Sequence, residues 1–331
     1  QLNNEDTTMS KNKKQSPFSA CLTHDFHKNG SYRILLLPSC NADYANRHTL
    51  ASAIDAKLDA TQPDFVFLVG DVTRNLSDAE ALHTVLADML APVFSRKLPW
   101  AHVFGDRDRA GVTADMVTAM PVVYSSLPRC LSGIGDAEHE DYTIGIVDAA
   151  DGEPIVCLYC LDSHSDIHAY ETRYGKPDAD GKLPPARLPQ PLYGKYYLDG
   201  IHYRQTIRCT HTAQALEEMY GRRIPSVLLF HTPIPEFSLV TMNQGNCRMS
   251  GFQRESIRCS GVNSGICAAA LERGDVRAIY AGNTAKNNWY GIFGGIHIGQ
   301  LIDFMGENGT PNGATVVEIS RDGTVSEQYL P

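Results

Sequence analysis

The chain has 331 residues, of which 43% are hydrophobic and 20% are charged. This hydrophobic content supports a packed core and excludes a disordered chain. The formal net charge of -9 gives no electrostatic support for binding nucleic acid. No apolar run approaches the roughly 20 residues of a membrane span, so a transmembrane segment is not expected.

The N-terminal 30 residues are polar and lack hydrophobic periodicity. We therefore expect residues 1–30 to form a disordered or extended tail and residues 31–331 to form a single domain. The sequence begins with Gln1 rather than Met. This indicates either a removed signal peptide or a missing N-terminal segment.

The first part of the expected domain alternates strands with helices. Apolar runs and 3.6-residue spacing predict strands at 32–37, 65–69 and 99–104 and helices at 48–60, 77–90 and 113–120. Because the helices separate the strands, the strands are expected to pair in parallel. Ser77 and Glu80 form a capping-box pattern, and Pro121 is expected to end the third helix.

The second part predicts more strands, more helices and a hairpin. Strands are predicted at 142–147, 155–161, 226–230 and 276–280, and helices at 206–220 and 264–272. Residues 171–195 are rich in Pro, Gly and Lys, which predicts a long surface loop. Strands at 314–319 and 324–329, on either side of Asp322 and Gly323, predict a hairpin.

Nine cysteines leave at least one thiol free or intermolecular if the compartment is oxidising. Cys157 and Cys160 have redox spacing, but they lie in a strand-like run, where positions three apart face opposite sides. Two packed strand cysteines are therefore favoured over a redox pair. Sequons occur at Asn29, Asn75 and Asn308. About two sequons are expected by chance, so they add little to the case for secretion.

The loops that follow the predicted strands carry a recognisable set of motifs, at the sheet edge where α/β folds bind ligands. They read PDFVFLVGD at 63–71, LYCLDS at 158–163, FHTPIPE at 230–236, VNSG at 262–265 and GDVRA at 274–278. Over residues 32–319 the chain resembles calcineurin-like metallophosphoesterases, in particular their small purple-acid-phosphatase-like branch. The resemblance implies an α/β fold in which two packed mixed β-sheets form a sandwich flanked by helices.

The resemblance also implies a site in which five loops hold two metal ions. In the family, the metals share a bridging aspartate and a hydroxide that attacks phosphorus. The first loop should read Asp-x-His, but Ser39 and Asn41 stand there. The fifth should read Gly-His-x-His, but Asn283 and Ala285 replace both histidines. A hydroxyl, an amide and a methyl group are poor substitutes for these ligands.

The other three loops keep part of the family pattern. Asp71 matches the bridging carboxylate, and His231 keeps the histidine of the fourth loop. The third loop, Gly-Asn-His-Asp in the family, here contains Asp106, Arg107 and Asp108. Arg107 replaces the histidine that would assist proton transfer, and arginine does not release a proton near neutral pH.

Counting ligands for each metal position predicts the loss of the binuclear centre. The first position keeps one effective ligand, Asp71. The second keeps Asp71, Asp106 and His231 beside the amide of Asn283, a set that could hold one hard or borderline cation. We therefore expect no bound cofactor, with a single divalent cation at the second position as the alternative.

The loss of metals would also leave carboxylates without compensating charge. Asp71, Asp106 and Asp108 fall in the same group of loops, and unpaired buried charge is costly. Arg107 and Lys286 are new cations in these loops. We expect them to compensate the carboxylate charge.

The surviving residues also have structural interpretations. Asp71 could be a turn residue or helix cap. His231 could be a structural histidine with satisfied hydrogen bonds. Residues 106–108 could form a surface turn, and 263–265 most simply cap the following helix.

Three functions follow from these readings. The first is a pseudophosphatase that serves as a structural or interaction component, with protein partners or a second copy, inside a larger assembly. The second is a phosphomonoesterase or phosphodiesterase with a one-metal site. The third is a phosphate sensor that uses Arg107 and Lys286. The cysteines, the sequons and the usual location of proteins in the family that this chain resembles favour a secreted, cell-surface or endomembrane location. A cytoplasmic assembly is the alternative.

Overall fold

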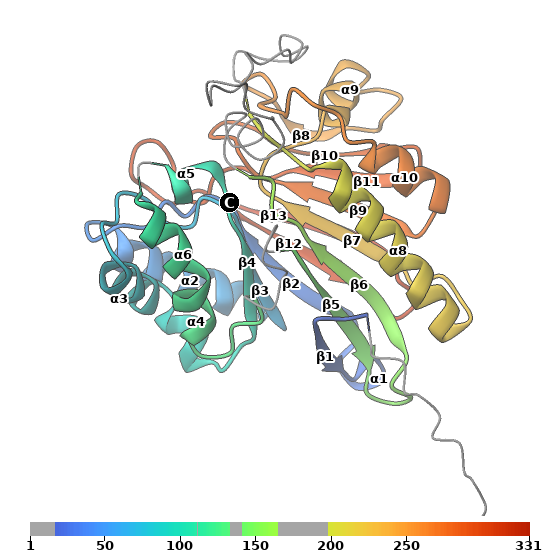
Figure 1. Ribbon diagram of the computed structural model, residues 1–331, viewed down its shortest axis with the longest axis horizontal. Helices are drawn as coiled ribbons and strands as arrows, with labels where there is room; N and C mark the ends of the chain where they lie inside the picture. Colours follow the sequence, from blue (N-terminus) through green and yellow to red (C-terminus); the bar gives the residue numbers. More distant parts are fainter. Residues whose placement is uncertain (1–16, 111, 133–140, 165–197) are drawn as a thin grey trace, which may run out of the picture.

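The structure is a computed structural model that describes residues 17–110, 112–132, 141–164 and 198–331. Two mixed β-sheets pack against each other, and helices cover their outer faces (Figure 1). The predicted fold of two packed mixed sheets flanked by helices is confirmed. The predicted loop at 171–195 lies outside the described residues.

The smaller sheet has five strands in the order β13-β12-β2-β3-β4. Their bounds are Tyr32–Leu37 for β2, Phe65–Val69 for β3, Trp100–Val103 for β4, Ala314–Ile319 for β12 and Val325–Leu330 for β13. The strands β2, β3 and β4 pair in parallel, as their connection by helices predicts. The predicted C-terminal hairpin is the antiparallel pair β12 and β13.

The larger sheet has eight strands in the order β1-β5-β6-β7-β9-β11-β10-β8. Their bounds are Ala20–His24 for β1, Tyr142–Asp148 for β5, Pro154–Cys160 for β6, Ser226–Phe230 for β7, Ser250–Phe252 for β8, Val276–Ala281 for β9, Asn288–Phe293 for β10 and Ile296–Gln300 for β11. The central strands β6, β7, β9 and β11 run parallel, whereas β10 and β8 add antiparallel strands at one edge.

The expected tail over residues 1–30 is wrong for residues 20–29. Strand β1 pairs in parallel with β5, and helix α1 (Phe26–Asn29) follows it. Phe26 is buried, and the Asp25 carboxylate accepts the backbone N–H of Lys28 at the start of the helix. As an edge strand, β1 buries only His24 fully, so its sequence shows no apolar run.

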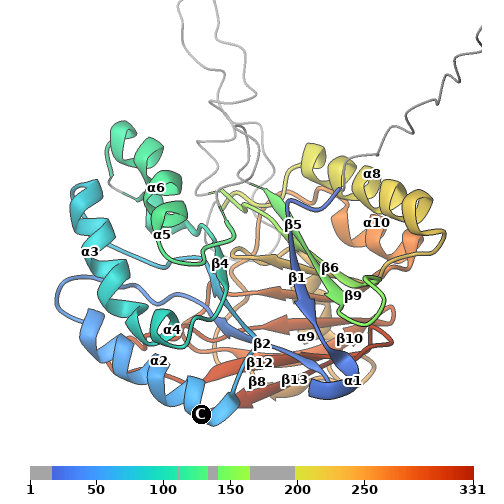
Figure 2. The same cartoon turned by 90° about the horizontal axis from the view of Figure 1, so that it is seen from below.

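Helices α2 (Arg47–Thr61), α3 (Ala79–Met89), α4 (Ala91–Ser95) and α6 (Ala114–Ser126) lie beside the smaller sheet (Figure 2). The predicted N-cap of α3 is wrong by one residue. Asp78 caps the helix by accepting the N–H of Ala81, and the Ser77 hydroxyl donates to the same Asp78 side chain. A carboxylate is favoured here because it also faces the positive end of the helix dipole.

Pro121 does not end α6, which continues to Ser126. Proline costs an internal hydrogen bond and about 3 kcal/mol in a helix interior. Met116, Met120 and Tyr124 recur every four residues on one face and are buried in the contact with α3. Burial of this face outweighs the cost of the proline.

Helices α8 (Tyr203–Tyr220), α9 (Glu236–Met242) and α10 (Ile266–Arg273) cover the larger sheet (Figure 1). Gly265 is the N-cap of α10, and the Asn263 side chain accepts its backbone N–H. The predicted helix start at 263–265 is therefore correct, although no side chain accepts a hydrogen bond from the first backbone N–H groups of α10. Among the described residues, no helix combines the length and apolarity needed to cross a membrane.

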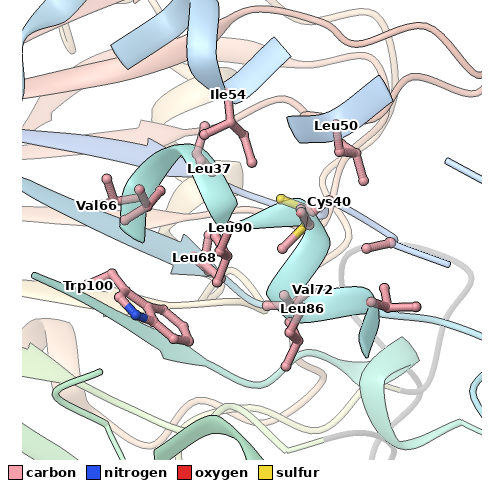
Figure 3. Close-up of a cluster of buried hydrophobic side chains, with 14 of the residues drawn as sticks. Leu37, Cys40, Leu50, Ile54, Val66, Leu68, Val72, Leu86, Leu90 and Trp100 are labelled. Carbon is pink, nitrogen blue, oxygen red and sulfur yellow. The ribbon is translucent and has the colours of Figure 1, made fainter. Parts of the chain in front are cut away.

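The core has three layers because strand residues alternate between two faces. In β3, Phe65 and Phe67 face the layer between the sheets, whereas Val66 and Leu68 face the helices. Figure 3 shows this outer layer, in which Leu50 and other residues of α2 and α3 meet the smaller sheet. A third layer lies between the larger sheet and helices α8, α9 and α10.

The same alternation decides the question of the two strand cysteines. Cys157 lies in the layer under α8, and Cys160 lies in the layer between the sheets. Both are buried, and neither takes part in a disulfide bond. Burial raises the pKa of both strand thiols. They are packed strand residues, as predicted, and do not form a redox pair.

Candidate functional site

The five predicted loops follow β2, β3, β4, β7 and β9, and they meet where the carboxyl edges of the two sheets come together. The Ser39 N–H donates to the carbonyl of Gly70, and the Gly282 N–H donates to the carbonyl of His231. The His231 Nδ1–H donates to the Val69 carbonyl at 2.9 Å, which joins the larger sheet to the smaller one. These hydrogen bonds therefore hold loops from both sheets together at the site.

The backbone of these loops has an unusual conformation. Ser39, Asn41, Asp71 and Asn283 all have φ between 47° and 58°, the left-handed region that non-glycine residues rarely adopt. Such strain persists only where the surroundings impose it, and it is concentrated at functional sites. The loops thus keep the left-handed backbone that is typical of active sites both at the retained Asp71 and at Ser39, Asn41 and Asn283, whose side chains have changed.

Asp71, Asp106 and His231 form the centre of the site. The Nε2 atom of His231 lies 3.3 Å from Asp71 Oδ2 and 3.3 Å from Asp106 Oδ1. Asp71 and His231 are buried, and Asp106 is about one-fifth exposed. The structure brings together the three residues that the sequence predicts as the remaining ligand set.

The charges in this cluster balance each other. Burial alone would lower the pKa of His231, but Asp71 and Asp106 raise it well above its ordinary value. Burial alone would raise the pKa of Asp106, but His231, Arg258 and Arg107 lower it. A protonated His231 between two carboxylates is the arrangement that this geometry favours.

Arg107 lies between the first and second loops. Its Nη1 lies 3.3 Å from Asn41 Oδ1, its Nε lies 3.6 Å from Asp71 Oδ2, and its backbone N–H donates to Asp71 Oδ1 at 2.8 Å. Its side chain is 42% exposed, so the ion pair is partly screened. The guanidinium contacts two residues that stand at ligand positions of the first metal.

Asp108 is a structural residue of the third loop. Its carboxylate accepts the N–H groups of Gly105 and Thr73, at 2.9 and 2.8 Å, and so holds the start of α5 (Asp106–Arg109) against the second loop. Burial, with the charge of Asp71, raises its pKa to about 7. Its hydrogen-bond partners are these backbone groups and the Thr73 hydroxyl, at 3.4 Å, which differs from the predicted pairing with Arg107.

The first loop has become a hydrogen-bonded turn. The Asn41 amide donates from Nδ2 to the Ser39 carbonyl at 3.0 Å, and its Oδ1 accepts from Arg107. The Asn41 N–H donates to the Asp71 carbonyl. The Asn41 side chain therefore stabilises the turn of the first loop.

The fifth loop is held by Glu255, which the sequence does not identify. Its Oε1 accepts the Thr284 hydroxyl at 2.5 Å and the N–H groups of Ala285 and Lys286 at 2.9 and 3.1 Å. Lys286 is half exposed, and its ammonium pairs with Glu307 at 3.4 Å. The structure thus gives Lys286 a partner other than the predicted carboxylates.

Asp303 is a second residue that no motif in the sequence identifies. It follows β11, is 5% exposed, and its Oδ1 has no hydrogen-bond partner among the described residues. Burial raises its pKa to about 7, an effect that Ser39, His231 and Arg107 only partly offset. An aspartate directly after an apolar segment, Leu301 and Ile302, is the signal that could have identified it.

The residues present do not fit a binuclear metal centre, but three of them could hold one cation. Ligand atoms of Asp71, Asp106 and His231 lie within 4.8 Å of one another. The Val69 carbonyl accepts the Nδ1–H of His231, which leaves Nε2 as the metal-facing atom. At the first metal position, Ser39, Asn41 and Ala285 supply no charged or imidazole ligand.

Comparison with known proteins places this chain near phosphatases. It is 23% identical over 275 residues to Probable inactive purple acid phosphatase 14 of Arabidopsis thaliana, covering 77% of this chain and 62% of the plant protein. It is 24% identical over 283 residues to Probable inactive purple acid phosphatase 29 of the same plant, covering 80% and 64%. The chain therefore spans just under two thirds of the length of these relatives.

The fold comparison agrees with the sequence comparison. A dimetal phosphatase from Danio rerio superposes with a TM-score of 0.53 at 11% identity, covering 91% of this chain and 99% of that structure. No protein-family model matches the chain. The homologues are purple-acid-phosphatase-like, and the fold is that of the calcineurin-like metallophosphoesterases.

Proposed function

We propose that this purple-acid-phosphatase-like chain, with its calcineurin-like metallophosphoesterase fold, is catalytically inactive and serves as a structural or interaction component of a larger assembly. Two-metal hydrolysis requires both a bridging hydroxide and charge stabilisation from two ions. The ligand substitutions at Ser39, Asn41, Asn283 and Ala285 argue against both.

The observation that carries the proposal is the position of Arg107. Its guanidinium contacts Asn41 and Asp71, which both stand at ligand positions of the first metal. A fixed positive charge there repels a metal cation and supplies part of the charge that the metal would have supplied. Arginine in place of the family histidine also removes the proton donor for the leaving group. One substitution thus opposes metal binding and proton transfer together.

The comparisons give independent support. Both plant relatives carry the description "probable inactive". We extend that description to this chain because its own metal-ligand positions are substituted.

The test is hydrolysis of a generic aryl phosphate by the purified chain in the presence of Mn²⁺, Fe²⁺ or Zn²⁺. We expect no rate above that of the Asp71→Asn variant, which removes the bridging carboxylate with little change of shape. A metal-dependent rate that Asp71→Asn abolishes would overturn the proposal.

A restored variant shows whether ligand loss is the cause. It combines Ser39→Asp, Asn41→His, Arg107→His, Asn283→His and Ala285→His. Because the loops retain the left-handed backbone of the site, we expect this variant to bind two equivalents of Mn²⁺ at the five loops by elemental analysis, more than the native chain binds. A folded variant that binds no more metal than the native chain would show that the ligand substitutions alone do not explain the inactivity.

A second candidate function is a phosphoesterase with one divalent cation at Asp71, Asp106 and His231. The convergence of these three side chains within 4.8 Å favours it. Here the cation would polarise a phosphoryl oxygen, while Asp71 and Asp106 would supply its charged ligands. Metal content after dialysis against Mn²⁺ or Zn²⁺ tests it, with His231→Gln as the control. Equal metal content in the two proteins rules this site out.

The partner class we propose is another protein or a second copy of this chain, and we exclude nucleic acid because of the net charge of -9. A secreted, cell-surface or endomembrane location remains our proposal, with a cytoplasmic assembly as the alternative. Light scattering distinguishes the two partner classes. A mass of two or more times 36.4 kDa indicates self-association, whereas a single-chain mass rules out a second copy of this chain as the partner under those conditions.

A further inference from the structure

A second cluster of metal-ligating side chains lies outside the five loops. It consists of His164, Asp199 and His202, whose ligand atoms lie within 4.8 Å of one another. All three residues are at most 5% exposed. His164 follows β6, whereas Asp199 and His202 directly precede α8. The cluster therefore joins the end of a central strand to the start of a helix.

The two imidazoles are held in defined positions. The His164 Nδ1–H donates to the Gly200 carbonyl at 3.1 Å. The His202 Nε2–H donates to Asp199 Oδ1 at 2.8 Å, and the Gly200 N–H donates to the same oxygen. The two rings stack with centroids 3.9 Å apart and planes inclined by 4°. A carbonyl that accepts from one ring nitrogen is the usual support that orients a metal-ligating histidine.

One atom of the cluster lacks a hydrogen-bond partner. Asp199 Oδ2 is buried, and no donor reaches it among the described residues. An unsatisfied buried acceptor costs about 1–3 kcal/mol, and more when it is charged. The hydrogen bonds from Gly200 and His202 both end on Asp199 Oδ1, so Oδ2 stays without a donor. A cation bound beside the carboxylate would remove this cost.

We propose that His164, Asp199 and His202 form a binding site for a borderline divalent cation of the Zn²⁺ class. Two imidazole nitrogens and one carboxylate oxygen are a common donor set for Zn²⁺, which completes four-coordination with one further ligand such as water. Hard cations such as Mg²⁺ and Ca²⁺ prefer sites built from oxygen ligands. The proposal goes beyond the proposed function and does not depend on it.

Binding would require the two imidazole rings to leave their stacked arrangement, because an imidazole nitrogen coordinates a metal in the plane of its own ring and two parallel rings cannot both point at one ion. Zn²⁺ ligand distances of about 2.0–2.2 Å in a tetrahedron place neighbouring ligand atoms about 3.3 Å apart. The present separation of His202 Nε2 and Asp199 Oδ1 is 2.8 Å, so these groups must separate by about half an ångström. The proton on His202 Nε2 leaves as the metal enters, so binding releases protons.

The experiment measures Zn²⁺ binding by the full chain carrying Asp71→Asn, a background in which the first cluster is disabled. The protein is stripped with a chelator and titrated with Zn²⁺ under calorimetry, and bound metal is counted by elemental analysis. We expect one equivalent of bound Zn²⁺. Adding Asp199→Asn or His164→Gln should weaken binding at least tenfold, whereas adding His211→Gln, an exposed position on α8, should leave it unchanged.

Cobalt supplies a second readout that does not depend on how well the variants fold. Co²⁺ bound at the cluster should give the intense visible bands of a four-coordinate site with nitrogen ligands, and Zn²⁺ should remove them. Retention of one equivalent in both Asp199→Asn and His164→Gln would overturn the proposal. So would the absence of bound Zn²⁺ in the Asp71→Asn background, or a six-coordinate Co²⁺ spectrum.

Discussion

His231 is the residue on which the charge balance of the central cluster depends. Replacing it with Gln removes the imidazole that lies 3.3 Å from both Asp71 and Asp106. Breaking a buried ion pair by removing one partner costs about 3–5 kcal/mol. We expect urea unfolding of His231→Gln at pH 6, in chelator, to show a loss of this size. The exposed control His211→Gln should stay within about 0.5 kcal/mol of wild type.

The pH dependence of that loss follows from the direction of the pKa shift. The pKa of His231 in the folded state lies well above 6.5, its ordinary value. Its charge therefore contributes full stability below pH 6.5, and this contribution is lost as the pH rises through the folded-state pKa. The difference between wild type and His231→Gln should shrink in alkaline solution. A difference that grows with pH would contradict the assignment.

Asp303 should show the opposite behaviour. Its pKa rises from 3.8 to about 7 on folding, mainly because of burial. The cost of ionising it in the fold is absent below pH 3.8, grows as the pH rises, and is complete above about 7. We expect Asp303→Asn to raise the free energy of unfolding by on the order of 4 kcal/mol at pH 8 and by less at pH 5. A loss of stability at pH 8 would indicate a stabilising partner for the carboxylate.

At the scale of elements, the third loop depends on a close approach of the backbone. A methyl group added at Gly105 would lie 2.2 Å from Asp71 Oδ1 and 2.5 Å from the Asp71 nitrogen. Because one of these atoms belongs to the backbone, the loops must separate. We expect Gly105→Ala to cost about 1–3 kcal/mol of stability, as overpacked sites do. Gly245→Ala is the matched control because a methyl group there meets open space. Equal urea midpoints for the two variants would disprove the steric argument.

The sequence predicted those elements whose residues are buried on both faces. Strands β2, β3 and β7 are continuous apolar runs because each lies between two layers of the core. Strand β1 was missed because an edge strand buries few of its side chains. Strands β10 and β11 were missed because Gly294 and Gly295 join short segments that contain polar residues. The helix through Pro121 could not be predicted locally, since burial against α3 decides it.

The candidate site was predictable where a residue lies within three residues of the end of a strand. Asp71, Asp106 and His231 do so, and parallel strands bring such residues to one edge. Glu255 could not be found in this way, because it reaches the fifth loop from a segment outside any strand. The partner of Lys286 was equally hidden, since Glu307 meets it only through the folding of the C-terminal region.

At the scale of the whole molecule, the layer between the sheets makes the two halves depend on each other. Phe65 and Phe67 of the smaller sheet share this layer with Ile144 and Leu158 of the larger one. Neither sheet can lose its partner without exposing this surface, at about 25 cal/mol per Å² of apolar area. We therefore propose that the two sheets unfold as one cooperative unit.

The two tryptophans test this proposal because each reports on a different sheet. Trp100 lies in the layer between the smaller sheet and its helices, and Trp289 lies in the layer under α9. In Trp289→Phe, fluorescence reports the smaller sheet alone, and in Trp100→Phe it reports the larger sheet alone. Within each variant, we expect the urea midpoint from fluorescence to coincide with that from far-ultraviolet circular dichroism, as two-state unfolding requires. Because each comparison is made inside one variant, the stability cost of either substitution cancels. A fluorescence transition that precedes the circular dichroism transition in one variant would show that its sheet unfolds first, and the two sheets would then belong to separate domains.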